Sequence, residues 1–203
     1  VQQKTNSPDP QFLISALQEV ENLSRIVKDM LLLARIDAGL GALEFSDVEL
    51  DESLLDVTAR LQKLATAKNI HIKFDIIENS ERTQVRGDYD LLSNLFFNLI
   101  ENAIKYSNPA SSIFIRVIWN QDQTIVEIED EGPGIPVENQ KVIFERFSRL
   151  APSGSTKGFG LGLAIANQIA ILHKAELSLQ EKPTQGTLFV FKVHNLSPHI
   201  KIS

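Results

Sequence analysis

One segment, residues 90–106, constrains the fold of this 203-residue chain more than any other. Its apolar residues recur every three or four positions, which is the spacing of an α-helix with a wide buried face. The apolar positions are Leu92, Leu95, Phe96, Leu99, Ile100, Ala103 and Ile104. The segment therefore predicts a helix with one side in the core of a folded domain.

The same helix carries a polar stripe. Asn94, Asn98 and Asn102 recur every fourth residue, with Lys105 one turn further on. At about 100° per residue, the four positions fall within roughly 80° of arc. Asparagine is a poor helix former, but its amide oxygen can complete the shell of a hard cation such as Mg²⁺. Lys105 would then stand where a phosphate needs neutralising. The alternative is an ordinary solvated helix face, and this helix alone does not decide between the two.

A second motif follows a predicted strand. Residues 124–130 alternate in polarity, and their parity places Asp130 on the apolar face. A buried carboxylate needs hydrogen-bond donors, and the exocyclic amine of a purine would serve. Gly132 and Gly134 come next, so the chain can turn sharply and a flat ring can approach closely. The alternative is a strand that ends in a common Asp-Gly turn.

A third motif, Phe144-Glu-Arg-Phe147, lies at the end of a helix that Pro136 could open as its first residue. Paired aromatic residues belong to the core more often than to a ligand site. We therefore expect Phe144 and Phe147 to anchor the loop that follows. Arg146 is the member of this motif that suits contact with a phosphate.

The fourth motif ends an aperiodic segment, residues 148–160, whose length fits a lid better than a tight turn. Residues 163–172 then predict a helix. Glycines at the start of a helix leave backbone N–H groups free to point at phosphate, where the helix dipole also favours negative charge. Lys157 adds a positive charge beside them. The glycines are Gly158, Gly160 and Gly162.

In this order the motifs resemble the N, G1, F and G2 boxes of sensor histidine kinases of bacterial two-component systems. These kinases share an ATPase superfamily with gyrase, the mismatch-repair ATPases and the ninety-kilodalton chaperones. The resemblance covers nearly the whole chain, and Lys105-Tyr106 favours the kinase branch. The other branches usually place a water-activating glutamate where this chain has Asn98. The resemblance therefore implies phosphoryl transfer rather than hydrolysis.

The resemblance also implies roles for individual residues. Asn102, helped by Asn98, would hold the Mg²⁺ of bound ATP, and Asp130 would accept a hydrogen bond from the adenine amine. Lys105 and Arg146 would contact phosphates and, with Asn102, form the catalytic set. The other nucleotide-binding positions are Tyr106, Gly132, Gly134, Ile135, Lys157, Gly158, Gly160, Leu161, Gly162, Leu163 and Thr187. Two departures from the family pattern affect the lid and a later turn: Phe159 replaces a common threonine, and His173-Lys174-Ala175 replaces His-Gly-Gly.

Runs of predicted strands with helices between them indicate an α+β fold, a two-layer α/β sandwich whose mixed sheet has helices on one face. A long helix of a dimerisation hairpin precedes it. The predicted helices span residues 52–67, 90–106 and 163–172. The predicted strands span residues 43–50, 70–77, 84–86, 112–119, 124–130, 176–180 and 187–193.

The N-terminal segment predicts a separate helical unit. Apolar residues step by three and four along it, which is the pattern of a helix–helix seam. We expect residues 1–39 to form the second helix of the hairpin, which pairs into a homodimer, and residues 40–203 to form the catalytic domain. The alternative is a helix that packs on its own catalytic domain. The seam positions are Leu13, Ala16, Val20, Leu23, Val27, Met30 and Ala34.

The phosphoacceptor histidine of the family lies in a Ser-His-Glu-Leu-Arg-Thr-Pro-like stretch, and nothing in this chain resembles that stretch. His71, His173, His194 and His199 fall in strand, helix-end and tail positions, where structural or exposed histidines are common. We therefore expect the chain to begin after the acceptor helix. It would phosphorylate a histidine on a helix that is not present, for relay to a response regulator.

Composition restricts the remaining classes of function. A formal charge of −6 argues against a nucleic-acid surface, and the absence of cysteine excludes disulfide and thiol chemistry. No apolar run approaches a membrane span, so the fragment is expected to be cytoplasmic without membrane contact, even if its parent is anchored in the bacterial inner membrane. Two other functions stay open: a hydrolytic ATPase clamp of the gyrase or chaperone type, and a nucleotide-binding regulator without catalysis.

Overall fold

The computed structural model describes residues 10–39, 44–78, 84–148, 159–182 and 184–196 of the chain. These residues divide into two compact units, Val1–Leu40 and Gly41–Ser203. Each unit is described by itself.

The first unit is a single helix, α1 (Pro10–Asp37). Most of the predicted seam is open to solvent along its length. The exposed seam positions with large side chains are Leu13, Val20, Leu23, Val27 and Met30. A row of five exposed apolar side chains on one helix is a surface that normally packs against another helix.

The second unit contains a five-stranded sheet in the order β2-β4-β5-β7-β6. Strand β2 pairs with β4 in parallel, and every other pair in this sheet is antiparallel. The predicted mixed sheet is thereby confirmed. The strands are β2 (His71–Glu78), β4 (Ser112–Trp119), β5 (Gln123–Asp130), β6 (Glu176–Gln180) and β7 (Thr187–His194). A separate antiparallel pair is formed by β1 (Ser46–Val48) and β3 (Val85–Gly87).

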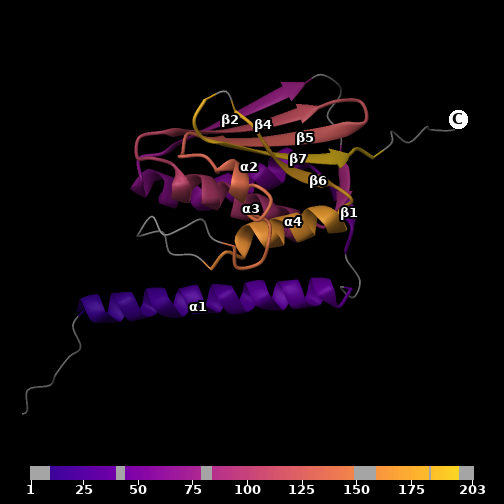
Figure 1. The fold of residues 1–203 in the computed structure, drawn as a ribbon. Helices are drawn as coiled ribbons and strands as arrows, with labels where there is room; N and C mark the ends of the chain where they lie inside the picture. The colour runs from indigo at the N-terminus through magenta and orange to yellow at the C-terminus, as the bar shows by residue number, and fades with distance from the viewer. Residues whose placement is uncertain (1–9, 40–43, 79–83, 149–158, 183, 197–203) are drawn as a thin grey trace, which may run out of the picture. The chain divides into compact units, whose positions relative to one another are not determined.

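Three helices, α2 (Leu50–Ala67), α3 (Tyr89–Tyr106) and α4 (Gly162–Leu172), lie on one face of the sheet (Figure 1). Burial alternates along β4 and β5, because one face of each strand meets these helices and the other does not. Phe96 of α3 packs edge to face on Phe191 of β7, with ring centroids 5.5 Å apart. The core therefore lies between α3 and the middle of the sheet.

Two predicted elements differ from the structure. The predicted strand at residues 43–50 is only the three-residue β1, because α2 already begins at the buried Leu50. The helix predicted after Pro136 is a single 3₁₀ turn, η1 (Val137–Asn139), followed by further turns. Between residues 137 and 148 only Ile143 is buried, so this segment has no apolar stripe that could hold a longer helix against the core.

Helix α3 is capped at both ends by polar contacts. At its N-terminus, the Asp88 carboxylate accepts a hydrogen bond from the Leu91 N–H (3.0 Å). At its C-terminus, the Lys68 ammonium of the α2–β2 connection donates to the carbonyls of Ile104 (3.0 Å) and Lys105 (2.7 Å). Burial, with the nearby charge of Lys105, lowers the pKa of Lys68. The helix that carries the asparagine stripe is thus fixed in position along its axis.

His173, at the end of α4, connects this helix to the start of α3. Its Nδ1 lies 2.8 Å from the carbonyl of Ile169, and its Nε2 accepts a hydrogen bond from the Asp88 N–H (3.0 Å). These partners require the neutral ring with its proton on Nδ1. Burial lowers the pKa of His173, which favours the same neutral form. The expectation of a structural role for this histidine agrees with its geometry.

We expect the stability of the second unit to fall as acid protonates His173. Because the folded state holds the pKa of His173 below its unfolded value, the stabilisation is complete above pH ~6.5 and is lost as pH decreases. Urea unfolding should show a steeper loss between pH ~6.5 and ~5 for the wild type than for His173→Gln. His71→Gln, at an exposed position in β2, is the matched control and should keep the wild-type slope. Equal slopes for wild type and His173→Gln would contradict this assignment.

Candidate functional site

The glycine at the start of α4 lies against the asparagine stripe of α3. A Cβ atom on Gly162 would lie 2.6 Å from Oδ1 of Asn98, which is closer than real Cβ contacts allow. No larger residue fits at position 162 unless Asn98 moves. The N-terminus of α4 is therefore seated directly beside the middle of the stripe.

The two central asparagines of the stripe differ in their hydrogen bonds. Nδ2 of Asn98 donates to the carbonyl of Asn94 (2.9 Å) and to its Oδ1 (2.8 Å), so Oδ1 of Asn98 faces α4. Asn102 lies one turn further on and is half-buried. Within the described ranges, no hydrogen bond is found for its amide. Its oxygen and that of Asn98 are therefore available to a ligand at this surface.

The backbone ties the third motif to the glycine segment. Gly160 has a φ of +71°, and a Cβ there would lie 2.4 Å from the carbonyl oxygen of Ser148. The carbonyl of Gly160 accepts a hydrogen bond from the Phe147 N–H (2.9 Å). Arg146, which is exposed, therefore lies within one residue of the contact with this segment.

Of the two aromatic anchors predicted in the third motif, one is correct. Phe144 packs edge to face on Phe189, with ring centroids 6.2 Å apart. The prediction for Phe147 is wrong, because its side chain is 60% exposed. Its φ of 63° turns the backbone toward Gly160 and leaves the ring outside the core.

The start of α4 has the features of an anion site, although a helix end alone does not establish one. Its N-cap, Leu161, has no side chain that caps the first N–H groups, and the first turn contains no acidic residue. The positive end of the helix dipole is thus not neutralised from within the helix. Leu161 is buried, and Leu163 is half-buried in the first turn.

Asp130 ends β5 on the helix-covered face and is only 4% exposed. Its carboxylate accepts a hydrogen bond from the Gly132 N–H (2.7 Å), and the register places Thr187 of β7 directly opposite. Burial raises the pKa of Asp130, while hydrogen bonds from Gly132 and Thr187 and the charge of Lys182 oppose that rise. Asp130 is thus a desolvated acceptor at the edge of the core, as its parity predicts.

The turn after Asp130 is closely packed against two other segments. A Cβ on Gly186 would lie 2.0 Å from the carbonyl oxygen of Asp130, and a Cβ on Gly134 would lie 3.1 Å from the carbonyl oxygen of Gly186. A Cβ on Gly132 would lie 3.1 Å from the carbonyl oxygen of Tyr106, the last residue of α3. The end of β5, the start of β7 and the end of α3 therefore meet at one point.

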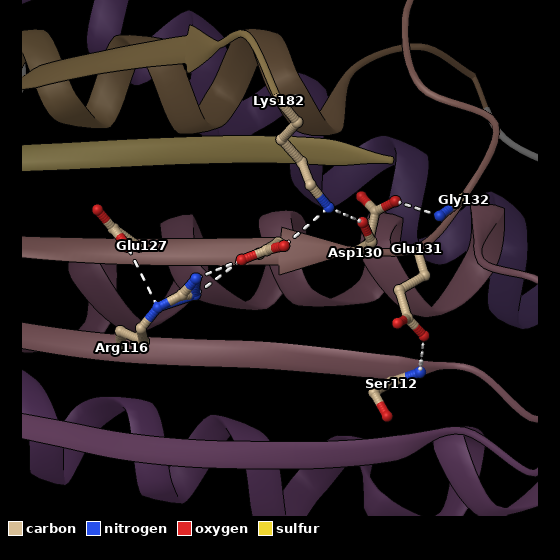
Figure 2. Close-up of polar contacts among 8 residues, drawn as sticks. Ser112, Arg116, Glu127, Asp130, Glu131, Gly132 and Lys182 are labelled. Carbon is tan, nitrogen blue, oxygen red and sulfur yellow. Dashed lines mark hydrogen bonds and ion pairs between the residues drawn. The ribbon is translucent and has the colours of Figure 1, made fainter. Parts of the chain in front are cut away.

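Figure 2 shows a charged network on the other side of the same turn. The Lys182 ammonium donates to the carbonyl of Asp130 (2.9 Å) and pairs with Glu129 (2.8 Å), whose carboxylate also binds Arg116. Arg116 in turn pairs with Glu127 (3.3 Å). Sequence reasoning missed Lys182, because it belongs to no motif and reaches Asp130 from a distant connection.

The remaining predicted site residues are Lys105, Tyr106, Ile135, Lys157 and Gly158. Lys105 is half-buried, with its ammonium 5.0 Å from the centre of the Tyr106 ring, and Tyr106 itself is exposed. Ile135 is half-buried, and its carbonyl accepts a hydrogen bond from Gln140 (3.2 Å). Lys157 and Gly158 lie outside the described residues.

The donor set at the stripe is compatible with a hard cation that brings its own anionic ligands. The described residues contain no group of three His, Asp or Glu side chains that could hold a metal by themselves. Asn98 and Asn102 supply neutral oxygens one turn apart, which suits Mg²⁺ that is bound largely by phosphates and water. Such a site holds a metal together with its nucleotide rather than the free ion.

The family comparison covers this whole site. Residues 87–196 match the family described as "Histidine kinase-, DNA gyrase B-, and HSP90-like ATPase". The chain is similar to the probable sensor protein PcoS of Escherichia coli, with 36% identity over 92% of this chain and 39% of PcoS. It is also similar to the sensor histidine kinase RppB of Synechocystis sp., with 30% identity over 93% of this chain and 42% of RppB.

Solved structures show the same fold. The histidine kinase AdeS of Acinetobacter baumannii matches with a TM-score of 0.76 and 25% identity, over 93% of this chain and 86% of AdeS. The mycobacterial sensor histidine kinase MprB matches with a TM-score of 0.65 and 26% identity, over 74% of this chain and 97% of that chain. This chain spans less than half the length of the curated relatives it matches. Among the described helices, none has the length and apolarity needed to cross a membrane.

We expect Gly186→Ala to destabilise the second unit strongly, because the new Cβ would collide with the carbonyl of Asp130 and the φ of +126° disfavours alanine. The free energy of unfolding should fall by about 3 kcal/mol or more. Gly134→Ala is the matched control, with a positive φ but a milder approach, and should cost only about 1–2 kcal/mol. Urea unfolding monitored by circular dichroism measures both. Equal losses would show that the close approach at Gly186 does not contribute.

Proposed function

Because the chain belongs to the histidine kinase-, DNA gyrase B- and HSP90-like ATPases, as the ATP-binding catalytic portion of a sensor histidine kinase, we propose that it transfers the γ-phosphate of Mg-ATP. The acceptor would be a histidine on a dimerisation helix, from which the phosphoryl group passes to a response regulator. The observation that carries this proposal is the contact of the α4 N-terminus with the asparagine stripe at Gly162 and Asn98. It joins a phosphate-binding element to metal-binding oxygens.

The adenine end of the nucleotide would lie at the turn after β5. The Asp130 carboxylate is desolvated and already accepts a hydrogen bond from the Gly132 N–H, so it can also accept one from the exocyclic amine. Thr187 stands opposite and Gly132 beside it, without a Cβ that would obstruct a flat ring. Tyr106 and Ile135 would line the same part of the site.

The phosphates would lie at the start of α4. The N–H groups of its first turn, following Gly160 and Leu161, would donate to phosphate oxygens. Lys105, Arg146 and Lys157 would supply positive charge. Asn98 and Asn102 would hold Mg²⁺, which neutralises charge on the β- and γ-phosphates when bound. The lid predicted in residues 148–160, of which residues 149–158 lie outside the described residues, would exclude water from the γ-phosphate.

The residues of the asparagine stripe favour phosphoryl transfer over ATP hydrolysis. Asn98 occupies the position at which a hydrolytic branch would need a base, and an amide cannot deprotonate water. Glu101 is the nearest carboxylate on α3, at about 60° from the centre of the stripe. Its direction makes it a poor general base for a water molecule at the phosphates.

The first unit would supply the dimerisation surface. We assign residues 1–39 to the second helix of the helical hairpin and residues 40–203 to the catalytic domain. The exposed apolar seam of α1 supports this assignment, because it requires another helix to cover it. In the intact protein that neighbour would include the acceptor helix and a second copy of the chain.

Asn102→Ala should lower the rate of Mg-ATP-dependent transfer by about a hundredfold or more, which would abolish it in practice. The substitution removes a ligand of the metal that neutralises the transferred phosphate. Asp130→Asn should act mainly on affinity and weaken ATP binding by about tenfold or more. Asn108→Ala, at an exposed position beyond α3, is the control and should retain both activities. Calorimetric titration and phosphoryl-transfer rates measure the two effects. An unchanged ATP titration for both site variants would reject the assignment.

A direct test supplies the full chain with a separate acceptor-bearing helical domain and γ-labelled ATP. Label on a histidine of the added domain supports the proposed kinase activity. Free phosphate alone would indicate a hydrolytic clamp, and bound but intact ATP would indicate a regulator. His173 is not a competing acceptor, because both of its ring nitrogens are engaged in the core.

A further inference from the structure

We propose that Lys182 is a positioning residue, which holds Asp130 in the geometry and charge state that adenine recognition requires. This inference rests on the proposed function, since it concerns the same nucleotide site. Lys182 lies in the connection between β6 and β7, outside every motif that the sequence analysis singled out.

Lys182 is buried to an extent that is unusual for lysine. Its side chain is only 6% exposed. Its ammonium donates to the carbonyl of Asp130 (2.9 Å) and pairs with Oε1 of Glu129 (2.8 Å). A buried ammonium is tolerated only where charged and polar partners compensate its lost hydration, so these contacts fix its position.

The network around Lys182 is anchored in the middle of the sheet. Glu129 is shared between Lys182 and Arg116, and Arg116 also pairs with Glu127 (Figure 2). Since Arg116 belongs to β4 and the two glutamates to β5, the network joins neighbouring strands to the β6–β7 connection. Lys182 therefore links this connection to the last residues of β5.

Lys182 contacts Asp130 from the face of the sheet opposite to the Asp130 carboxylate. Side chains of neighbouring strand residues point to opposite faces, so Glu129 lies on the helix-free face and the Asp130 carboxylate on the helix-covered face. Lys182 meets the Glu129 side chain and the Asp130 backbone, and it is thus separated from the nucleotide by the strand itself. Lys182 would therefore act on binding indirectly, through the backbone of Asp130 and the adjacent turn at Gly186.

Two consequences follow from this placement. The hydrogen bond to the Asp130 carbonyl holds the turn at which Gly186 and Gly134 are already closely packed. The positive charge also opposes the rise in the pKa of Asp130 that burial causes. Other charged or titratable side chains near this turn are Glu129, which pairs with Lys182, Glu131, which accepts a hydrogen bond from the Ser112 N–H, and Lys105 and the exposed Tyr106 at the end of α3.

The test is calorimetric titration of the full chain with Mg-ADP at several pH values between about 5 and 8. Lys182→Met removes both the charge and the hydrogen-bond donor. Lys182→Gln removes the charge but keeps a donor. The glutamine variant replaces the methionine variant in the test if the latter fails to fold. Both should weaken binding by about threefold to tenfold at the upper pH. In both, the pH at which affinity is half lost should move upward, because Asp130 then protonates more readily. The phosphate groups of Mg-ADP also titrate in this pH range, but their effect on affinity is the same for every variant and cancels when variants are compared with the wild type.

Lys192→Met, further along β7, is the matched control and should keep the wild-type affinity and pH profile. In an Asp130→Asn background, Lys182→Gln should cause no shift of the profile, because the titrating carboxyl is gone. An unshifted profile for the single variants, or the same shift without Asp130, would overturn the role of Lys182. If the wild type itself fails to bind Mg-ADP, the proposed function is overturned together with this inference.

Discussion

The close approach of glycine backbone to α3 and to the end of β5 is the constraint on which the rest of this structure depends. Gly162 meets Asn98, Gly132 meets the last carbonyl of α3, and Gly186 meets Asp130. A Cβ would lie 2.6 Å from Asn98 and 2.0 Å from the Asp130 carbonyl oxygen, which is too short, and 3.1 Å from the Tyr106 carbonyl oxygen, which is tight, so glycine stands where these elements touch. These approaches bring the polar oxygens of α3 beside an uncapped helix end, and the end of α3 beside the turn that follows the buried Asp130.

The parts of this arrangement that depend on local periodicity could be predicted from the sequence. Strands β4 and β6 have the predicted bounds, and the three main helices begin within two residues of prediction, because alternation and helical spacing are local signals. Asp130 was predicted to face the core from parity alone, and its 4% exposure confirms it. The resemblance to sensor histidine kinases is supported by the family match and the relatives, whereas the individual site roles stay predictions.

The parts that depend on distant segments could not be predicted in this way. Lys68, His173 and Lys182 each form a hydrogen bond with a helix or strand that is distant in sequence. No spacing pattern in the sequence predicts such contacts. The prediction that Phe147 is a core anchor was wrong for a related reason. Its positive φ accompanies the hydrogen bond of its N–H to Gly160, a contact that the hydrophobicity of Phe147 does not reveal. Lys174 likewise has a φ of 52°, so the fold imposes a backbone conformation that lysine does not favour.

The order of strands in the sheet has a consequence for synthesis of the protein. Strand β5 is complete early, but its partner β7 and the connection that carries Lys182 come from the last part of the described chain. A nascent domain that has emerged from the ribosome only as far as α4 holds Asp130 without Thr187 opposite it and without the neighbouring ammonium. Because a domain generally folds as one unit, the nucleotide site that we propose at Asp130 can be completed only after β7 has been synthesised.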